Sequence, residues 1–194
     1  MLSDSKNNKV GDTGRKKWPS RIILTGYRGT GKSLVGAGLA KQLGCDFIDT
    51  DYLLSEQFQC SLANFVRKEG WDAFRQAEKN LLAKLAHANN VVIATGGGAI
   101  MHHDAWQDLR KDGWVVWLQA EPGTIRKRLR QDELSESQRP SLTGSSLSGE
   151  VEEVLASRHP YYEKGSDLTV DTTNMSPAGI ILNIVKLLTD DEIQ

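Results

Sequence analysis

The sequence predicts a doubly wound α/β fold, in which helices cover both faces of a parallel sheet. Short apolar segments with strand character alternate with helical segments along most of the 194 residues, as expected for parallel strands joined by crossovers. Residues 91–94 form a continuous apolar run, which is typical of a parallel strand buried on both faces. A glycine-rich segment joins the first predicted strand to a helix. Because ligands bind beyond the carboxyl ends of the strands in such sheets, residues that follow predicted strands are the candidates for a functional site.

Five strands and eight helical segments are expected along the chain. The strands are predicted at residues 21–25, 45–48, 91–94, 114–118 and 168–171. The helices are predicted at residues 34–43, 52–58, 61–68, 71–87, 102–111 and 150–163, with two more that begin at Pro122 and after Ser176. Each strand precedes at least one helix, so crossover connections would return the chain to the same sheet.

Turn-forming and capping residues set the bounds of these elements. Apolar residues four apart define one face of the first helix, which ends before Gly44, a favourable left-handed cap. Gly70 separates two helical segments because glycine is a poor helix former. Pro122 opens a helix at its first turn, where a missing N–H costs nothing. Ser176 and Pro177 cap the last helix, which carries an apolar stripe.

Composition predicts a single globular domain and gives no electrostatic sign of a nucleic-acid or membrane partner. Charged residues make up 25% of the chain, but the net charge is only −1, so electrostatics do not favour nucleic acid or an anionic membrane as partners. No apolar run approaches the roughly 18 residues of a membrane-spanning helix, and the polar start lacks a signal-peptide core. Cys45 and Cys60 are most simply free thiols. We therefore expect a cytoplasmic monomer, with one domain over residues 21–190 and a disordered tail at residues 1–20.

A phosphate-binding loop is predicted at residues 26–33, which fit the pattern G-x-x-x-x-G-K-[ST] between a strand and a helix. Its glycines let successive N–H groups point inward, and the helix N-terminus adds partial positive charge. Lys32 can then reach the β- and γ-phosphates, and the Ser33 hydroxyl can bind Mg²⁺. A glycine-rich turn without a ligand is the alternative interpretation. The residues expected to bind ATP here are Gly26, Gly29, Thr30, Gly31, Lys32, Ser33 and, directly after the segment, Leu34.

Two aspartates follow the second predicted strand. Asp49 and Asp51 are two residues apart, so both side chains would point the same way if the strand continued through them. One carboxylate could then serve Mg²⁺, directly or through water, and the other a substrate hydroxyl. A capping role in a loop is the alternative, since aspartate is common in turns.

Two further segments have the chemistry of a substrate site. Arg75 and Glu78 are three apart on a predicted helix, so the glutamate could hold a guanidinium suited to a substrate carboxylate; a surface ion pair is the alternative. Gly96–Gly98 follow the buried strand at residues 91–94. They allow close backbone approach to a ligand, with free N–H groups as donors.

Two arginines are further candidates. Arg139 lies in the polar, glycine- and serine-rich segment 132–149, which is a candidate mobile loop. An arginine on such a loop can close over the phosphates and neutralise transition-state charge. Arg158 lies near the end of a predicted helix. Solvated charges are the alternative for both.

Taken together, these segments resemble the shikimate kinase family from about residue 21 to residue 188. The resemblance rests on several motifs in family order: the phosphate-binding loop, Phe47-Ile48-Asp49-Thr50-Asp51, Phe74-Arg75-x-x-Glu78, Gly96-Gly97-Gly98, Arg139-Pro140-x-Leu142, Arg158-x-Pro160-x-Tyr162 and Val170-Asp171-Thr172. Several motifs in order are far more specific than any one of them.

The resemblance implies a fold and a reaction. The expected fold is a three-layer α/β/α P-loop kinase with a five-stranded parallel sheet in the order 2-3-1-4-5. A substrate-binding helical part is expected at about residues 50–80 and a mobile lid at about residues 130–149. The expected reaction is transfer of the ATP γ-phosphoryl group, with Mg²⁺, to the 3-hydroxyl of shikimate.

The resemblance also implies roles for the candidate residues. Asp51 would bind the shikimate hydroxyls and accept or orient the proton, Arg75 and Arg158 would clamp the carboxylate, and Gly96–Gly98 would line the substrate.

At the phosphates, the resemblance implies that Lys32 stabilises the transferring charge and that Arg139 contacts ATP from the lid. Ser33 and, through water, Asp49 would serve Mg²⁺. Lys32, Asp51 and Arg139 are therefore the expected catalytic residues.

Two other functions fit parts of the sequence. A related small-molecule kinase, such as a gluconate kinase, would share the phosphate-binding loop. A kinase-like binding or regulatory protein is a different class, which the joint presence of Lys32, Ser33, Asp51 and Arg139 argues against.

One position departs from the family pattern. The family often has a basic residue about seven positions before the lid arginine, where this chain has Asp132, with Arg128 and Arg130 slightly upstream. His102 and His103 follow the glycine turn, and we expect neither a metal nor an acid–base role for them.

Overall fold

Five parallel strands form one sheet in this computed structural model, which describes residues 18–131 and 147–190. The strands are β1 (Arg21–Thr25), β2 (Asp46–Asp49), β3 (Val91–Ala94), β4 (Gly113–Gln119) and β5 (Leu168–Asp171). Their order in the sheet is β2-β3-β1-β4-β5, and every neighbouring pair is parallel. This confirms the parallel α/β fold and the expected strand order. The carboxyl ends of β1, β2 and β3 therefore meet at one edge of the sheet.

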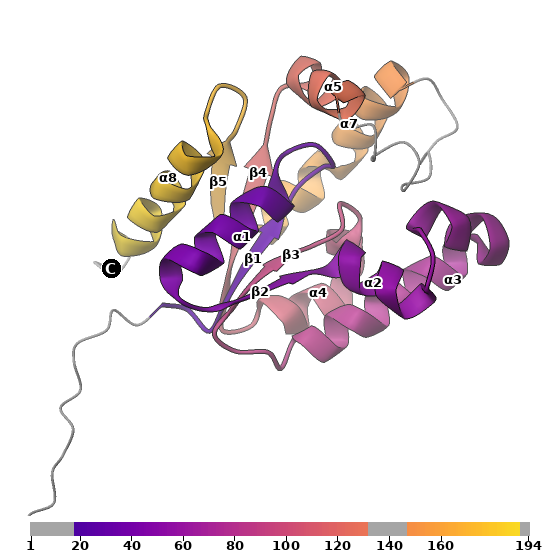
Figure 1. Cartoon of the computed structure of the whole chain (residues 1–194), viewed down its shortest axis with the longest axis horizontal. Coiled ribbons are helices and arrows are strands. Elements are labelled where there is room, and N and C mark those ends of the chain that lie inside the picture. The colour runs from indigo at the N-terminus through magenta and orange to yellow at the C-terminus, as the bar shows by residue number, and fades with distance from the viewer. Residues whose placement is uncertain (1–17, 132–146, 191–194) are drawn as a thin grey trace, which may run out of the picture.

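Helices cover both faces of the sheet and its carboxyl end. They are α1 (Lys32–Leu43), α2 (Thr50–Phe58), α3 (Leu62–Leu85), the 3₁₀ turn η1 (Ala99–Met101), α4 (His103–Arg110), α5 (Pro122–Gln131), α7 (Leu147–Gly165) and α8 (Pro177–Asp190). Figure 1 shows α5 and α7 together at one end of the sheet and α2 with α3 on its β2 side. No helix in the described parts of the chain is long and apolar enough to cross a membrane.

Alternate strand residues enter two separate cores. Ile22 and Leu24 of β1 pack with Val35 and Leu39 of α1 and with the apolar stripe of α8. Ile23, between them, faces the opposite core, which α3, α4 and α7 complete. The continuous apolar character of the strands follows from this, because side chains on both faces are buried.

The predicted bounds mostly agree with the observed ones. Gly44 caps α1 in the left-handed conformation with φ 69°, and Gly70 interrupts α3 with φ 84°. Ser176 accepts a hydrogen bond from the N–H of Gly179 through Oγ at 3.2 Å, which confirms the predicted cap of α8.

Some bounds differ from the predicted ones. Residues 130–131 and 147–149, placed in the predicted lid, belong to α5 and α7, and the rest of that segment lies outside the described residues. Of the predicted tail, residues 1–17 lie outside the described residues, whereas Trp18 packs against the core that contains α1 and α8.

Arg21 ties together the end of the sheet that is opposite the candidate site. It lies at the start of β1 and is 4% exposed. Its guanidinium donates to the backbone carbonyls of Leu109 at 3.1 Å, Ala88 at 2.7 Å and Lys111. A single side chain thus satisfies carbonyls at the end of α4 and in the connection between α3 and β3.

Replacing Arg21 should destabilise the fold without affecting the site. Arg21→Met leaves these carbonyls without their donor, so we expect a loss of about 2–4 kcal/mol in the free energy of unfolding. Urea denaturation measures this, with the exposed Arg67→Met as control, which should change stability by less than about 0.5 kcal/mol. Equal stability of the two variants would show that Arg21 is not a structural tie.

Candidate active site

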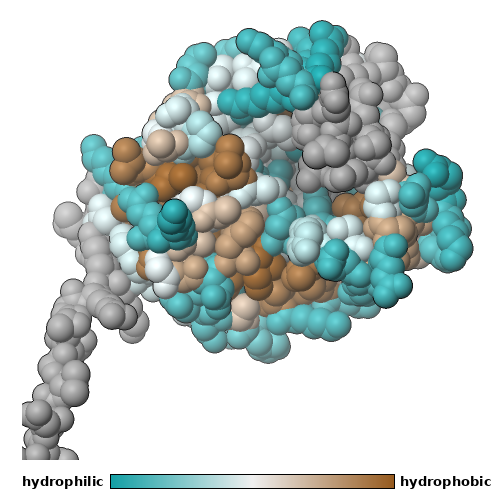
Figure 2. All heavy atoms as spheres, viewed as in Figure 1, coloured by the Kyte–Doolittle hydropathy of each residue, from teal (hydrophilic) through white to brown (hydrophobic). Residues whose placement is uncertain are grey.

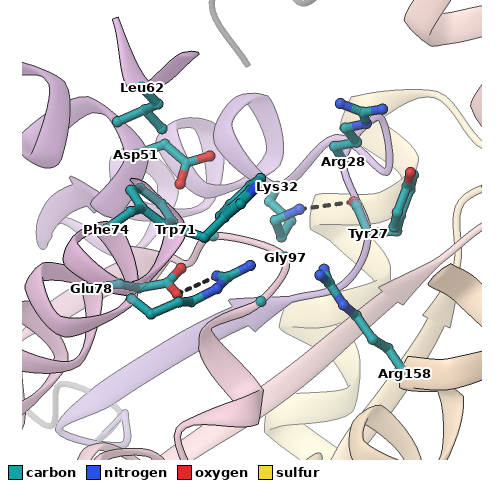
Figure 3. A pocket seen from close by; sticks show the side chains of 13 residues that line it. Tyr27, Arg28, Lys32, Asp51, Leu62, Trp71, Phe74, Glu78, Gly97 and Arg158 are labelled. Carbon is teal, nitrogen blue, oxygen red and sulfur yellow. Dashed lines mark hydrogen bonds and ion pairs between the residues drawn. The ribbon is translucent and has the colours of Figure 1, made fainter. Parts of the chain in front are cut away.

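A cavity opens where the carboxyl ends of β1, β2 and β3 meet (Figure 3). Its walls come from the loop after β1, from α2, α3 and α7, and from the glycine turn after β3. The predicted residues that line it are Lys32, Asp51, Arg75, Gly96, Gly97, Gly98 and Arg158. Residues separated by more than 120 positions in the sequence therefore face one space.

The loop between β1 and α1 has the backbone that a phosphate-binding loop requires. Gly26 has φ 133°, and a Cβ there would overlap the carbonyl oxygen of Leu118. Gly31 has φ 95° and directly precedes α1. The hydroxyl of Thr30 donates to the carbonyl of Tyr27 at 2.8 Å, which closes the loop. Such a loop at a helix N-terminus presents backbone N–H groups to an anion.

Lys32 is buried at the inner side of this loop. Its Nζ donates to the carbonyl oxygens of Gly26 at 2.7 Å and Tyr27 at 2.9 Å. Figure 3 shows the ammonium end at the cavity, on the side opposite Phe74 and Trp71. The ammonium group thus lies where the loop between β1 and α1 borders the cavity.

Asp49 links the end of β2 to the phosphate-binding loop. Its Oδ2 accepts a hydrogen bond from Ser33 Oγ at 2.5 Å. Its Oδ1 accepts from the N–H groups of Asp51 at 3.0 Å and Tyr52 at 3.2 Å, so it also caps α2. The capping interpretation of Asp49 is therefore confirmed, whereas its role toward Mg²⁺ stays a prediction.

The condition for strand alternation at the two aspartates is not met. The strand ends at Asp49, and Asp51 lies in the first turn of α2. The capping bonds of Asp49 start the helix there, and the helical turn, not strand alternation, places Asp51 beside the cavity.

Arg75 is held by an acid and an aromatic ring. Its Nη1 lies 2.6 Å from Glu78 Oε2, and its guanidinium carbon lies 5.1 Å from the centroid of the Trp71 ring. Burial would raise the pKa of Glu78, but the hydrogen bond from His102 and the Arg75 charge outweigh it and lower that pKa. Glu78 is therefore ionised at neutral pH, and the predicted Arg75–Glu78 pair lines a cavity instead of forming a surface ion pair.

Gly96 separates the two carboxylates of the site. A Cβ on Gly96 would lie 2.7 Å from Glu78 Oε1 and 2.8 Å from Asp51 Oδ1, so a larger residue there would require both carboxylates to shift. Its N–H is not free as expected, because it donates to Thr50 Oγ1 at 2.9 Å. This bond joins the glycine turn to α2.

The next two glycines each lie against an arginine. A Cβ on Gly98 would overlap the Arg75 guanidinium, and one on Gly97 would lie 3.6 Å from Arg158 Nη1. Tyr162 donates its hydroxyl to the Gly97 carbonyl at 2.6 Å, and burial raises the pKa of Tyr162 to about 12, so this donor is retained. The turn thus forms a floor with a guanidinium at each side.

The sequence motifs gave no role to Arg28, and they left open whether Arg128 or Arg130 contacts the nucleotide. Arg28 lines the cavity and pairs with the buried Glu150 at the start of α7, 122 residues away. Arg28 occupies a variable position of the loop pattern, so the motif gave no signal for it. Arg128 donates to Thr172 Oγ1 at 3.0 Å and to the Gly29 carbonyl at 3.3 Å, so it contacts the phosphate-binding loop.

Some predicted residues are not placed in the cavity. Arg139 and Asp132 lie outside the described residues. Leu34 lies in the first turn of α1 with an exposed side chain, and Arg130 is exposed on α5. The described residues contain no group of three or more His, Cys, Asp or Glu side chains that could hold a metal ion by themselves.

Comparisons with known proteins agree with this geometry. A family model described as shikimate kinase matches residues 28–189. "Shikimate kinase 2" of Yersinia enterocolitica is 39% identical over 173 residues, which cover 89% of this chain and 98% of that protein. The protein of the same name from Yersinia pestis is 37% identical over an equal length.

Solved structures show the same likeness. The shikimate kinase of Acinetobacter baumannii, in complex with shikimate, superposes with a TM-score of 0.84 at 28% identity. That match covers 91% of this chain and 96% of the other. A gluconokinase of Sinorhizobium meliloti has a TM-score of 0.50 at 15% identity, which is a likeness of fold alone. Since the family model spans most of the chain and the relatives match it over nearly their whole length, the chain belongs to the shikimate kinase family.

Proposed function

We propose that this chain transfers the γ-phosphoryl group of ATP to the 3-hydroxyl of shikimate. The observation that carries the proposal is the arrangement of charges around one cavity. Two guanidiniums, from Arg75 and Arg158, lie against the glycine turn, while Asp51 and Lys32 line the same space. This suits a small substrate with a carboxylate on one side and a hydroxyl on the other.

Positioning and electrostatics would supply the catalysis. Phosphoryl transfer needs the acceptor hydroxyl in line with the γ-phosphate and needs compensation of charge on the transferring group. Asp51 would orient the hydroxyl and accept its proton, and Lys32 would stabilise the developing phosphate charge. Arg139 would add charge from the proposed lid at about residues 130–149, and a part at about residues 50–80 would bind the substrate.

The oxygen donors beside the loop fit Mg²⁺. Ser33 Oγ and Asp49 Oδ2 are 2.5 Å apart at the start of α1, and both are hard oxygen donors. Mg²⁺ is usually held by one or two protein groups with waters and substrate phosphates, so a dedicated cluster of side chains is not needed. We propose that Ser33, with Asp49 acting through water, would hold the ion, which would supply positive charge at the phosphates.

Removal of Mg²⁺ is expected to abolish turnover. EDTA should stop ADP release, and added Mg²⁺ should restore it. Ser33→Ala should raise the Mg²⁺ concentration for half-maximal rate about tenfold or more, because a direct ligand is lost. Ser55→Ala is the matched control, since the Ser55 hydroxyl donates to the carbonyl of Tyr52 on α2, outside the phosphate-binding loop. An unchanged Mg²⁺ requirement in Ser33→Ala would remove Ser33 from the proposed metal site.

A coupled ADP-release assay tests the reaction. It compares shikimate, gluconate and no acceptor, each with Mg-ATP. Saturable turnover on shikimate alone is the expected result. Turnover on gluconate would favour the related kinase, and shikimate binding without turnover would favour a regulatory protein.

The other expectations about partners stay part of the proposal. We propose a cytoplasmic location and a monomeric state. The lack of nucleic-acid or membrane partners is consistent with a net charge of −1. On the face in Figure 2, apolar residues form patches among hydrophilic ones. The exposed side chains of Leu34, Tyr52 and Leu182 come from three different helices. Sedimentation equilibrium tests the monomeric state.

A further inference from the structure

His102 contacts the buried acid that holds Arg75. It lies between η1 and α4, and its Nε2 is 2.8 Å from Glu78 Oε2. The same oxygen accepts the hydrogen bond from Arg75 Nη1 at 2.6 Å. The side chains of His102 and Glu78 are 13% and 2% exposed. These three residues therefore form a connected group that runs from behind the glycine turn to the cavity.

The hydrogen bonds from His102 and Arg75 set the orientation of the Glu78 carboxylate. Both converge on Oε2, while Oε1 lies beside Gly96. If the His102 donor were lost, only Arg75 would hold Oε2, and the carboxylate could rotate about its terminal bond. The Arg75 guanidinium would follow, because its ion pair with Glu78 sets its orientation against Gly98. His102 thus acts on the guanidinium although it does not line the cavity.

We propose that His102 is a positioning residue for recognition of the substrate carboxylate. It donates to Glu78 so that Glu78 holds the Arg75 guanidinium toward the carboxylate, between Gly98 and the cavity. This inference rests on the proposed function, because it assumes a carboxylate substrate. It assigns His102 neither a metal nor a proton-transfer role.

The neighbouring histidine offers a matched control. His103 begins α4, its side chain is 84% exposed, and its Nδ1 is 3.4 Å from the exposed Asp104 carboxylate. His103→Ala removes a histidine side chain next to His102 but leaves the contact between His102 and Glu78 in place. An effect that depends on the His102 contact should therefore be absent in His103→Ala.

The experiment measures KM and kcat of four variants. His102→Ala should raise KM for shikimate about tenfold and change kcat less than about threefold, since a hydrogen bond to a charged group is lost without contact to the reacting atoms. His102→Gln, whose amide nitrogen can reach the position of Nε2, should restore KM to within about threefold of the wild type. His102→Asn, which is too short, should behave like His102→Ala. KM for ATP should stay unchanged in all of them.

A neutral substrate analogue separates positioning from general disruption. Shikimate methyl ester lacks the negative charge that Arg75 would recognise, so its KM should change less than about twofold in His102→Ala. If thermal unfolding shows that His102→Ala does not fold, the shikimate KM of His102→Gln is compared with that of His102→Asn instead.

Three results would overturn the inference. They are an unchanged shikimate KM in His102→Ala or His102→Asn, an equal rise for the methyl ester, and an equal rise in His103→Ala. If the wild-type chain neither binds nor phosphorylates shikimate, the proposed function fails and the inference fails with it. If the wild type is active and only the variants disagree, the inference alone fails.

Discussion

Asp51→Asn is expected to lower kcat about a thousandfold while the Kd for ATP stays nearly unchanged. The carboxylate lines the cavity beside Gly96 and lies on α2, outside the phosphate-binding loop. Asparagine keeps the shape of the side chain but cannot accept the proton of the acceptor hydroxyl. Steady-state kinetics on shikimate, together with calorimetric titration of ATP, measures both quantities.

A surface aspartate controls for charge removal. Asp72→Asn changes an exposed residue of α3 and should leave kcat within about twofold of the wild type. Near-wild-type turnover in Asp51→Asn would remove Asp51 from the catalytic role. A parallel loss of ATP affinity would instead indicate that the substitution disturbs the phosphate-binding loop.

Lys32→Met is expected to lower kcat/KM about a thousandfold, with an effect on ATP as well as on turnover. The lysine ammonium is buried beside the loop and bonded to the carbonyls of Gly26 and Tyr27. Methionine fills a similar volume without the charge, so both the ground-state contact to phosphate and the stabilisation of transition-state charge are lost. Single-turnover kinetics at saturating shikimate separates ATP binding from the chemical step.

The expected pattern differs from that of Asp51→Asn. Lys32→Met should raise the Kd for ATP, whereas Asp51→Asn should not. Lys41→Met, an exposed change in the last turn of α1, serves as the control. Thermal unfolding verifies that each variant is folded. Normal ATP affinity and turnover in Lys32→Met would contradict the proposed phosphate-binding role of the loop.

Local patterns in the sequence predict the elements and the position of the site. Strand β3 has its predicted bounds because four consecutive apolar residues indicate burial on both faces. Gly44 and Gly70 end or interrupt helices at the predicted residues because their left-handed φ values disfavour other residues. The phosphate-binding loop is fully local, since its glycines, lysine and serine lie within eight residues. Such features need no information about distant parts of the chain.

Local patterns do not predict the order of the strands in the sheet, because alternating strands and helices fit several orders of a parallel sheet. The family resemblance implied that order. The observed order β2-β3-β1-β4-β5 places the segments after β1, β2 and β3 beside one another. The fold is therefore predictable as a class from patterns, and in detail only through the resemblance.

By itself, the sequence determined the secondary structure, the phosphate-binding loop and a set of candidate polar residues. Only the tertiary structure decided their contacts. It placed Arg75 and Arg158 against adjacent glycines, and it joined Arg28 to Glu150 across 122 residues. It also gave Glu78 a second donor in His102, which no spacing indicated. The physical reason is that these contacts depend on how separate helices pack against the sheet, and side chains far apart in the sequence set that packing. Strands, helix caps and the phosphate-binding loop are instead set by neighbouring residues.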